Sequence, residues 1–208
     1  MTVQLQPRED TIQIPETERK LIAIELEGIT PLLCGRKPDT LFDDLVGKTQ
    51  KKVSKTKKLD LNKIYRESLY IYDEELPDDH PEKYGFLAIA PLKALVSACR
   101  VVDKLNMTQA RAIWSTPDTL MPLRWEKLSM FKCVGVNQKT KDAIPIVRPM
   151  FEDWSVTFRL SLDTEFVSLE QSLYALQKAG TAYGIGCMRP EKGLTYGQFR
   201  AVKATMES

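Results

Sequence analysis

The sequence of 208 residues contains few of the residue types on which most enzyme active sites and metal centres depend. It has 1 histidine, 4 cysteines and 10 glycines. The cysteines are scattered and include no C-x-x-C pair, so they predict free thiols in a reducing compartment, not a zinc site or a disulfide framework. The only histidine, His80, lies between acidic residues and a proline, which is typical of a surface loop and not of a general base. We therefore expect no catalytic site, no bound metal and no cofactor.

Long apolar runs and known enzyme motifs are absent as well. No apolar segment approaches the ~18 residues that a membrane-spanning helix needs. The first 20 residues are polar and charged, which is unlike a secretory signal. The glycines have neither Walker nor dinucleotide-binding spacing, and the sequence has no serine elbow. These features predict a soluble, cytoplasmic protein that is not an enzyme and does not contact membranes.

Neither sign of charge is in clear excess. The 30 basic and 28 acidic residues leave a formal net charge of +2, so any argument from charge must be local. Lysines concentrate between residues 48 and 58, where apolar residues are few. Such a block is either a basic finger that contacts the phosphates of a nucleic acid or an ordinary solvated loop, and the sequence leaves both interpretations open.

Half of the glycines fall in one stretch near the C-terminal end, between Ala179 and Phe199. They are Gly180, Gly184, Gly186, Gly193 and Gly197. Because glycine adopts positive φ and lets another backbone approach closely, this stretch predicts a shaped loop. Arg189 and Lys192 lie among the glycines, so the favoured ligand is a phosphate backbone held by loop amides and by these two cations. The alternative is a helix that ends at Gly180 and an ordinary glycine-rich turn after it.

Residues 131–151 form another region where positive charge meets flat or soft side chains. Two strand-like runs flank the polar turn 137–142, which predicts a hairpin. Its cations are Lys132, Lys139, Lys141 and Arg148, and its aromatic and thioether side chains are Phe131, Met150 and Phe151. This mixture suits single-stranded nucleic acid, since cations contact phosphates while flat or soft groups contact bases. An ordinary exposed hairpin is the alternative interpretation.

Hydrophobic periodicity predicts the order of the remaining elements. We expect strands at 20–28, 120–135, 143–151, 153–163 and 196–203, helices at 91–105 and 168–180, a short helix at 108–114 and a hairpin over 69–89. Without the inserted segments, the order is strand, helix, strand, strand, helix, strand. This order predicts an α+β fold with a ferredoxin-like or RRM-like βαββαβ core, whose open sheet face often binds single-stranded nucleic acid. Residues 1–19 are expected to be an N-terminal arm, and residues 20–208 a single domain with insertions at 36–68 and 131–151.

Two segments carry a resemblance to a known family. Lys20–Gly35 combines a strand with the turn Thr30-Pro31-Leu32-Leu33, and Gly180–Phe199 is the glycine-rich loop before the last strand. In these segments and in its order of elements the chain resembles the RAMP superfamily, the repeat-associated proteins that form backbone and processing subunits of CRISPR effector complexes. The chain is short for a backbone subunit. Its last segment is also similar to small phage and prophage proteins that end in Gly-Ile-Gly…Arg-Pro-Glu-Lys-Gly…Gly-x-Phe.

The resemblance implies binding of RNA or single-stranded DNA, often by many copies side by side. The favoured hypothesis is therefore a non-catalytic protein that binds single-stranded nucleic acid, with RNA favoured, and assembles as repeated copies along the strand. Its partners would be the nucleic acid, other copies of itself and other subunits of an effector complex. The residues predicted to contact nucleic acid are Arg36, Lys51, Lys52, Lys55, Lys57, Lys58, Lys132, Lys139, Lys141, Arg148, Gly184, Gly186, Arg189, Lys192 and Gly193.

Two other functions stay open. The first is a phage structural or inhibitory protein that imitates a CRISPR backbone subunit. The second is a RAMP-type RNA endonuclease, because some proteins of that superfamily process RNA. Metal-independent cleavage of RNA generally uses a histidine as general acid or base, and His80 is the only one in the chain.

Overall fold

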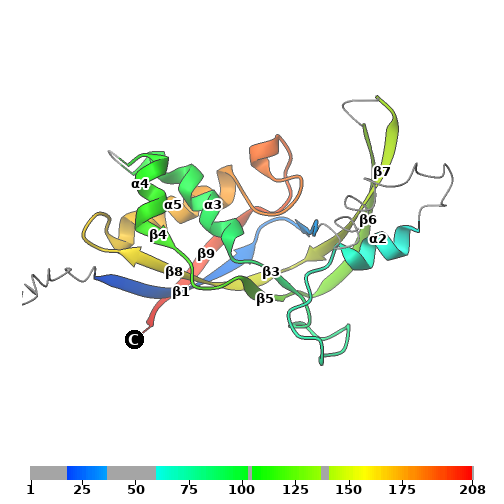
Figure 1. The fold of residues 1–208 in the computed structure, drawn as a ribbon, viewed down its shortest axis with the longest axis horizontal. Coiled ribbons are helices and arrows are strands. Elements are labelled where there is room, and N and C mark those ends of the chain that lie inside the picture. The colour runs from blue at the N-terminus through cyan, green and yellow to red at the C-terminus, as the bar shows by residue number, and fades with distance from the viewer. Residues whose placement is uncertain (1–17, 37–59, 103–104, 137–140, 208) are drawn as a thin grey trace, which may run out of the picture.

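The structure is a computed structural model that describes residues 18–36, 60–102, 105–136 and 141–207. It confirms an α+β fold with antiparallel sheets. Helices cover one face of the main sheet, and a long hairpin projects from one end of it (Figure 1). The expected N-terminal arm falls almost entirely outside the described residues, as does the lysine-rich stretch 48–58. The division of the chain into one domain with insertions stays a prediction.

The main sheet contains the first and the last strands of the described chain. Its order is β3-β5-β8-β1-β9, and β4 pairs with β8 beyond the end of β5. The strands are β1 (Arg19–Gly28), β3 (Gly85–Leu87), β4 (Trp114–Ser115), β5 (Leu120–Arg124), β8 (Ser155–Asp163) and β9 (Phe199–Glu207). Every pairing is antiparallel, and the central pair aligns Ile24 of β1 with Phe158 of β8. Strands β1 and β8 lie close to where periodicity predicts them, whereas β9 begins three residues later and ends four residues later than the predicted strand 196–203.

A period of two separates the faces of the central strands. Along β8, alternate residues from Val156 to Leu162 are buried under the helices, while Thr157 is exposed on the other face. The buried set of β1 runs from Ile22 to Leu26 in the same alternation. Both strands therefore have one apolar and one polar face, as the alternation in the sequence predicts. One layer of helices covers the apolar face.

Three helices form that layer. They are α3 (Ile89–Ala98), which continues into the 3-10 turn η1 (Cys99–Val101), then α4 (Met107–Ile113) and α5 (Leu169–Ala182). The capping box that begins α5 is confirmed, because Ser168 Oγ accepts a hydrogen bond from Gln171 N and Gln171 Oε1 accepts one from Ser168 N. The prediction that α5 ends at Gly180 is wrong. The helix continues to Ala182, and Gly180 is buried where a Cβ would collide with the carbonyl oxygen of Phe199.

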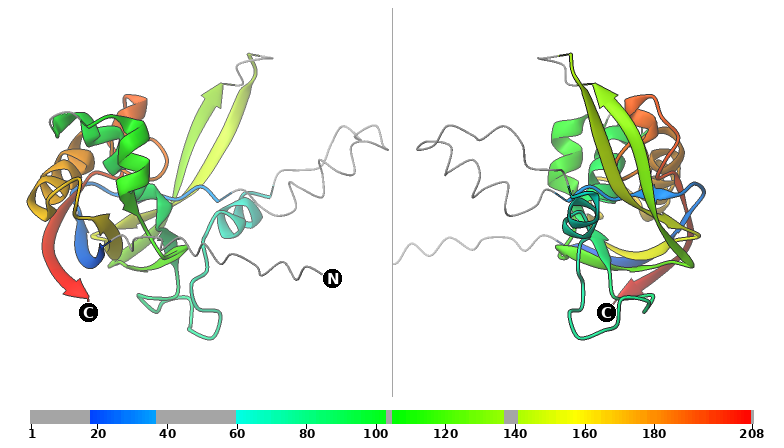
Figure 2. Two further views of the ribbon diagram at one scale, coloured as in Figure 1. Left: turned by 60° about the vertical axis from the view of Figure 1, so that its left-hand side comes forward. Right: turned by 90° about the vertical axis from the view of Figure 1, so that its right-hand side faces the viewer.

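A smaller sheet carries the hairpin. It consists of β2 (Leu32–Leu33), β7 (Ala143–Glu152) and β6 (Lys127–Val136) in the order β2-β7-β6. The predicted hairpin is confirmed, and both of its strands extend away from the rest of the chain in two views (Figure 2). The short helix α2 (Leu61–Glu67) packs against β7 near the base of the hairpin.

Two expectations about strands need correction. The run 120–135 is not one strand, because it breaks at Trp125 and passes from the main sheet into the smaller one. The segment 69–89 is not a regular hairpin either. The backbone ladder between its two halves is limited to one bridge between Ile71 and Tyr84, and β3 pairs with β5 instead. In both cases a partner far away in the sequence decides the pairing, which local periodicity does not encode.

The core between the main sheet and the helices contains two buried tryptophans whose indole N–H groups are hydrogen-bonded. Trp114 donates from Nε1 to Ser172 Oγ at 3.0 Å, and Trp154 donates from Nε1 to the carbonyl oxygen of Thr30 at 2.8 Å. Both indoles are almost fully buried, so these bonds offset the cost of removing the N–H groups from water. The four cysteines are free, as expected. No helix in the described ranges is long and apolar enough to span a membrane.

We expect Phe158→Ala to lower the free energy of unfolding by about 3–5 kcal/mol, because the ring is fully buried at the centre of the main sheet. Urea unfolding followed by circular dichroism measures the loss. The matched control is Thr157→Ala on the exposed face of the same strand, for which we expect a change within about 0.5 kcal/mol. Equal losses at the two positions would contradict the assignment of the faces.

Candidate nucleic-acid interface

The glycine-rich loop lies against the end of the first strand. The loop follows α5, contains the 3-10 turn η2 (Pro190–Lys192) and leads into β9. Gly197 N donates to Pro31 O at 2.9 Å, and Cys187 N donates to Leu33 O at 2.8 Å. Ile29 N donates in the opposite direction, to Gln198 O at 2.8 Å. The two segments that carry the family resemblance are therefore hydrogen-bonded to each other, although the 144 residues from 36 to 179 lie between them.

The glycines of the loop serve its own packing. Gly184 and Gly197 are buried, with φ of 62° and 68°, and a Cβ at Gly197 would collide with the carbonyl oxygen of Ile185. Gly193 differs, because it is exposed and a Cβ there would have no heavy atom within 4 Å. The amides of Gly184 and Gly193 already donate to Ala179 O and Pro190 O. These two amides are thus committed inside the loop, and the predicted contact of Gly184, Gly186 and Gly193 with phosphates stays a prediction.

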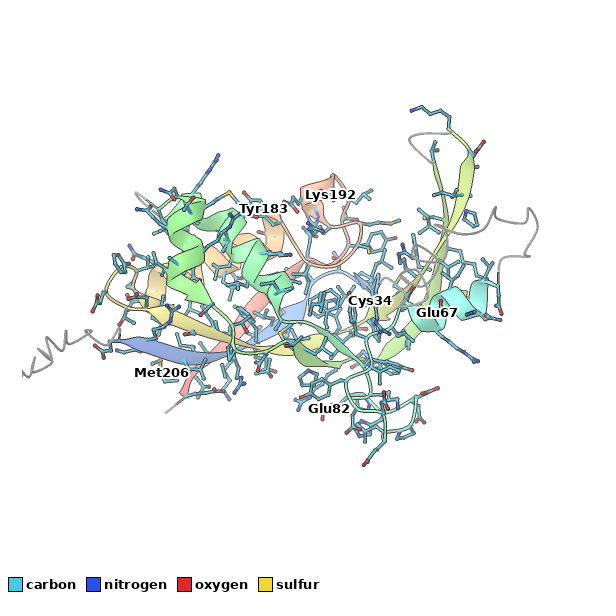
Figure 3. All side chains as sticks on the ribbon, in the orientation of Figure 1. Cys34, Glu67, Glu82, Tyr183, Lys192 and Met206 are labelled. Carbon is cyan, nitrogen blue, oxygen red and sulfur yellow. The ribbon has the colours of Figure 1, made fainter. Side chains whose placement is uncertain are left out.

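The two cations of the loop differ in their surroundings. Arg189 donates from Nε and Nη2 to Glu191 Oε2, and from Nη1 to the carbonyl oxygen of Gly186 at 3.2 Å. Its charge is therefore balanced within the loop. Lys192 is exposed and forms no ion pair with any of the described residues. It lies at the outer end of the loop, away from the body of the molecule (Figure 3).

The hairpin contacts the loop through an aromatic pair. Phe131 of β6 and Tyr196 of the loop have ring centroids 5.5 Å apart at an interplanar angle of 65°, and both side chains are half-buried. Arg148 of β7 lies directly opposite Phe131, so the two side chains share one face of the hairpin. The Arg148 side chain also reaches Gly35, since a Cβ there would lie 3.2 Å from Arg148 Nε. The hairpin, the loop and the chain after β2 therefore meet at one surface.

Cys187 and Arg36 also belong to this surface. A Cβ at Gly35 would collide with Sγ of Cys187, which brings the loop against the segment that follows β2. Burial raises the pKa of the nearby Tyr70 hydroxyl, the thiols of Cys34 and Cys187 raise it further, and Arg36 acts in the opposite direction. Arg36 follows Gly35 directly in the chain, and its backbone amide donates to Ser68 O at 3.2 Å. Cys34 is labelled in Figure 3, between the loop and the base of the hairpin. We name this surface the hairpin–loop junction and define it by Gly35, Arg36, Phe131, Arg148, Cys187 and Tyr196.

The predicted contact residues are only partly brought together. Arg36 and Arg148 lie at the junction, and Arg189 and Lys192 lie on the adjoining loop. Lys132 is exposed on the opposite face of the hairpin from Phe131, and Lys141 is exposed at the far end of β7. The remaining predicted residues lie outside the described ranges; these are Lys51, Lys52, Lys55, Lys57, Lys58 and Lys139.

A cleft that the sequence does not reveal lies on the helical side of the glycine-rich loop. It has a volume of about 830 Å³ and is bounded by α3, α4, β4 and the loop. Its charged lining residues are Lys93, Arg111, Arg189 and Glu191, and Tyr183 lies at its edge with α5. Lys93 and Arg111 are single cations on otherwise ordinary helices, so no motif marks them in the sequence. We name this feature the helical cleft.

The open face of the main sheet offers no aromatic platform within the described strands. The aromatic side chains of β4, β8 and β9 are Trp114, Phe158 and Phe199, and all three are buried on the helical side. Two cations on the open face are engaged with carboxylates, whereas Lys203 of β9, opposite Glu25, forms no ion pair with a described residue. Arg159 forms ion pairs with Asp118 and Glu207, and Arg200 forms one with Glu27 at 2.9 Å. The open face therefore lacks the aromatic stacking groups that a single strand would need there.

Comparison with known proteins gives a weak structural likeness and no relative in sequence. No protein-family model matches the chain, and no curated protein matches it either. Among solved structures, the fold is similar to the crystal structure of Cmr6 from Pyrococcus furiosus, with a TM-score of 0.38 and 8% sequence identity over 90% of this chain and 100% of that one. A likeness of this size does not establish a shared family.

We expect Gly197→Ala to lower the free energy of unfolding by about 3 kcal/mol or more, because the alanine would combine a strained positive φ with a collision against backbone. Gly193→Ala is the matched control, since its φ is 76° but its surroundings are open. It should cost only about 1–2 kcal/mol. Urea unfolding of both variants tests this, and similar losses would show that the loop does not pack as described.

Proposed function

We propose that this protein is a non-catalytic protein that binds single-stranded nucleic acid, with RNA favoured, and that the strand contacts the hairpin–loop junction. One observation carries the proposal: the half-buried aromatic pair of Phe131 and Tyr196 lies on the same surface as Arg148 and Arg36. Single-strand binding sites combine cations for the phosphates with aromatic faces for the bases, and this combination is sequence-tolerant. Here this combination occurs where the hairpin and the glycine-rich loop come into contact, and the sequence predicts each of these two segments separately to bind nucleic acid.

The role of each group follows from its position. Arg148 donates to the carbonyl oxygen of Val147 from Nη1 and forms no ion pair with a described carboxylate, so its charge is open to a phosphate. Tyr196 or Phe131 then offers a ring to the adjacent base. Lys192 would continue the positive track along the loop. Binding of this kind positions a strand and requires no general acid or base.

We also propose that the core of the fold is ferredoxin-like. In the βαββαβ unit the fourth strand lies beside the first, the first beside the third, and the third beside the second. The arrangement β9-β1-β8-β5, with α3 and α4 after β1 and α5 after β8, supports this assignment. The hairpin of β6 and β7 then forms an insertion between the second and third strands of the core.

Membership of the RAMP superfamily and assembly in repeated copies are part of the same proposal. The contact between the Thr-Pro-Leu turn and the glycine-rich loop supports the first, because the residues that carry the resemblance form one unit. Exposed apolar side chains near the far end of the hairpin support the second. Val134, Val136 and Ile144 have exposed fractions of 74%, 57% and 41%, and such a group favours a protein partner.

No contact among the described residues supports either of the two alternative functions. His80 lies in the segment between α2 and β3, and its Nδ1 accepts a hydrogen bond from Glu82 N at 3.1 Å. Glu82 lies below the main sheet and Lys192 above it in Figure 3. The histidine is therefore placed in a loop on the other side of the molecule from the glycine-rich loop. A role as an inhibitor or a phage structural subunit would appear as protein partners that survive nuclease treatment.

We expect the protein to bind a fluorescently labelled single-stranded RNA with an affinity that falls steeply with salt, which anisotropy at several salt concentrations measures. Arg148→Gln should weaken binding about tenfold and reduce the slope against salt by about 1, because one phosphate contact is lost. Tyr196→Leu should weaken binding about fivefold or more through lost stacking, with little change in the slope.

The matched control for these variants is Lys203→Gln. Lys203 is an exposed cation on β9, opposite Glu25, so its removal changes the net charge as Arg148→Gln does but not the junction. The affinity of the Lys203→Gln variant for the RNA should stay within about twofold of that of the unmodified protein. Salt-insensitive binding, or an equal loss for Lys203→Gln and Arg148→Gln, would contradict the proposal.

A further inference from the structure

The helical cleft is a separate concave site. Its volume of about 830 Å³ lies in the range of small-molecule pockets, which is roughly 300–1,000 Å³. None of the residues that define the hairpin–loop junction lines it. The cleft and the junction share only the glycine-rich loop, which contributes Gly184, Ile185 and Arg189 to the cleft and Tyr196 to the junction.

The lining of the cleft carries uncompensated positive charge. Arg189 is neutralised by Glu191, which leaves Lys93 of α3 and Arg111 of α4. Within the described ranges, neither of these two side chains forms an ion pair or a hydrogen bond. The lining therefore has a net formal charge of +2 that no described carboxylate balances. Two cations that line one concave surface raise the local concentration of anions.

The rest of the lining is apolar with a few hydroxyl groups. Val96, Ile185 and the half-buried ring of Tyr183 supply apolar surface, and Ser97 and Ser115 supply hydroxyls. Apolar walls with a small number of polar groups are the usual composition of a pocket for an organic ligand. Inorganic anions would gain nothing from the apolar part, and a purely apolar ligand would leave the two cations unpaired. An amphipathic organic anion fits both parts.

We propose that the helical cleft binds a free nucleoside phosphate, separately from the strand at the hairpin–loop junction. Its phosphate group accepts from Lys93 and Arg111, and its base lies against the apolar wall beside Tyr183. A continuous strand is the poorer fit, because its phosphates need a track of cations and the cleft offers two on facing helices. The ligand site goes beyond the proposed function and does not depend on it.

The test uses isothermal titration calorimetry on the full chain with ADP, adenosine and inorganic phosphate as probes. ADP should bind once per chain, and adenosine and phosphate should each bind at least about tenfold more weakly, since each satisfies only half of the lining. Arg111→Gln and Lys93→Gln should each weaken ADP binding about tenfold. Both residues are exposed on helices, so the variants should unfold at nearly the same urea concentration as the unmodified protein.

The matched control is Lys178→Gln, an exposed cation on α5 that does not line the cleft, which should leave ADP binding unchanged. Single-stranded RNA binding is measured on the same variants. Arg111→Gln and Lys93→Gln should retain it to within about twofold, because neither lies at the junction. The inference is overturned if ADP does not bind, if the Lys93→Gln/Arg111→Gln double variant binds it as well as the unmodified protein, or if saturating RNA displaces it. If the unmodified protein binds ADP but does not bind RNA, the proposed function is contradicted and this inference is not.

Discussion

The backbone hydrogen bonds between the glycine-rich loop and the end of the first strand are the constraint on which both candidate sites depend. Pro31 and Leu33 accept from the loop, and Ile29 donates to it. Because these hydrogen bonds fix the position of the loop, Tyr196 on one side of it contacts the hairpin, and Arg189 on the other side lines the helical cleft. If the loop packed elsewhere, both surfaces would be lost even though every residue that lines them was unchanged in the sequence.

The distribution of charge distinguishes the two surfaces of the loop from the open sheet. On the open sheet, Arg159 and Arg200 are paired with carboxylates, so much of the positive charge of that face is neutralised. Around the loop, Arg148, Lys192 and Arg111 have no carboxylate partner among the described residues. Each surface of the loop thus combines an unpaired cation with a half-buried aromatic ring, Tyr196 at the junction and Tyr183 in the cleft.

The sequence predicts most of the strands and helices, but only part of the candidate site. The alternation along β8 and the capping box at Ser168 are local signals, and both are found in the structure. The glycines of the loop mark a shaped turn, yet their reason is mainly internal packing, because the partner atoms at Pro31 and Leu33 are remote in sequence. The contact of Phe131 with Tyr196 and the presence of Lys93 and Arg111 in one cleft depend on how elements pack, and no spacing in the chain encodes that packing.

The projecting hairpin has an energetic consequence of its own. Near its base, β7 is supported by β2 and α2, whereas the described distal residues 134–136 and 143–146 pair with each other in the ladder between β6 and β7. Two strands without a third layer are marginally stable in water. Amide protons at this end should therefore exchange with solvent far sooner than those of β1 or β8, by local opening that leaves the rest of the domain intact. A molecule that covers the distal ribbon would slow that exchange, and the ordering it imposes would weaken its measured affinity.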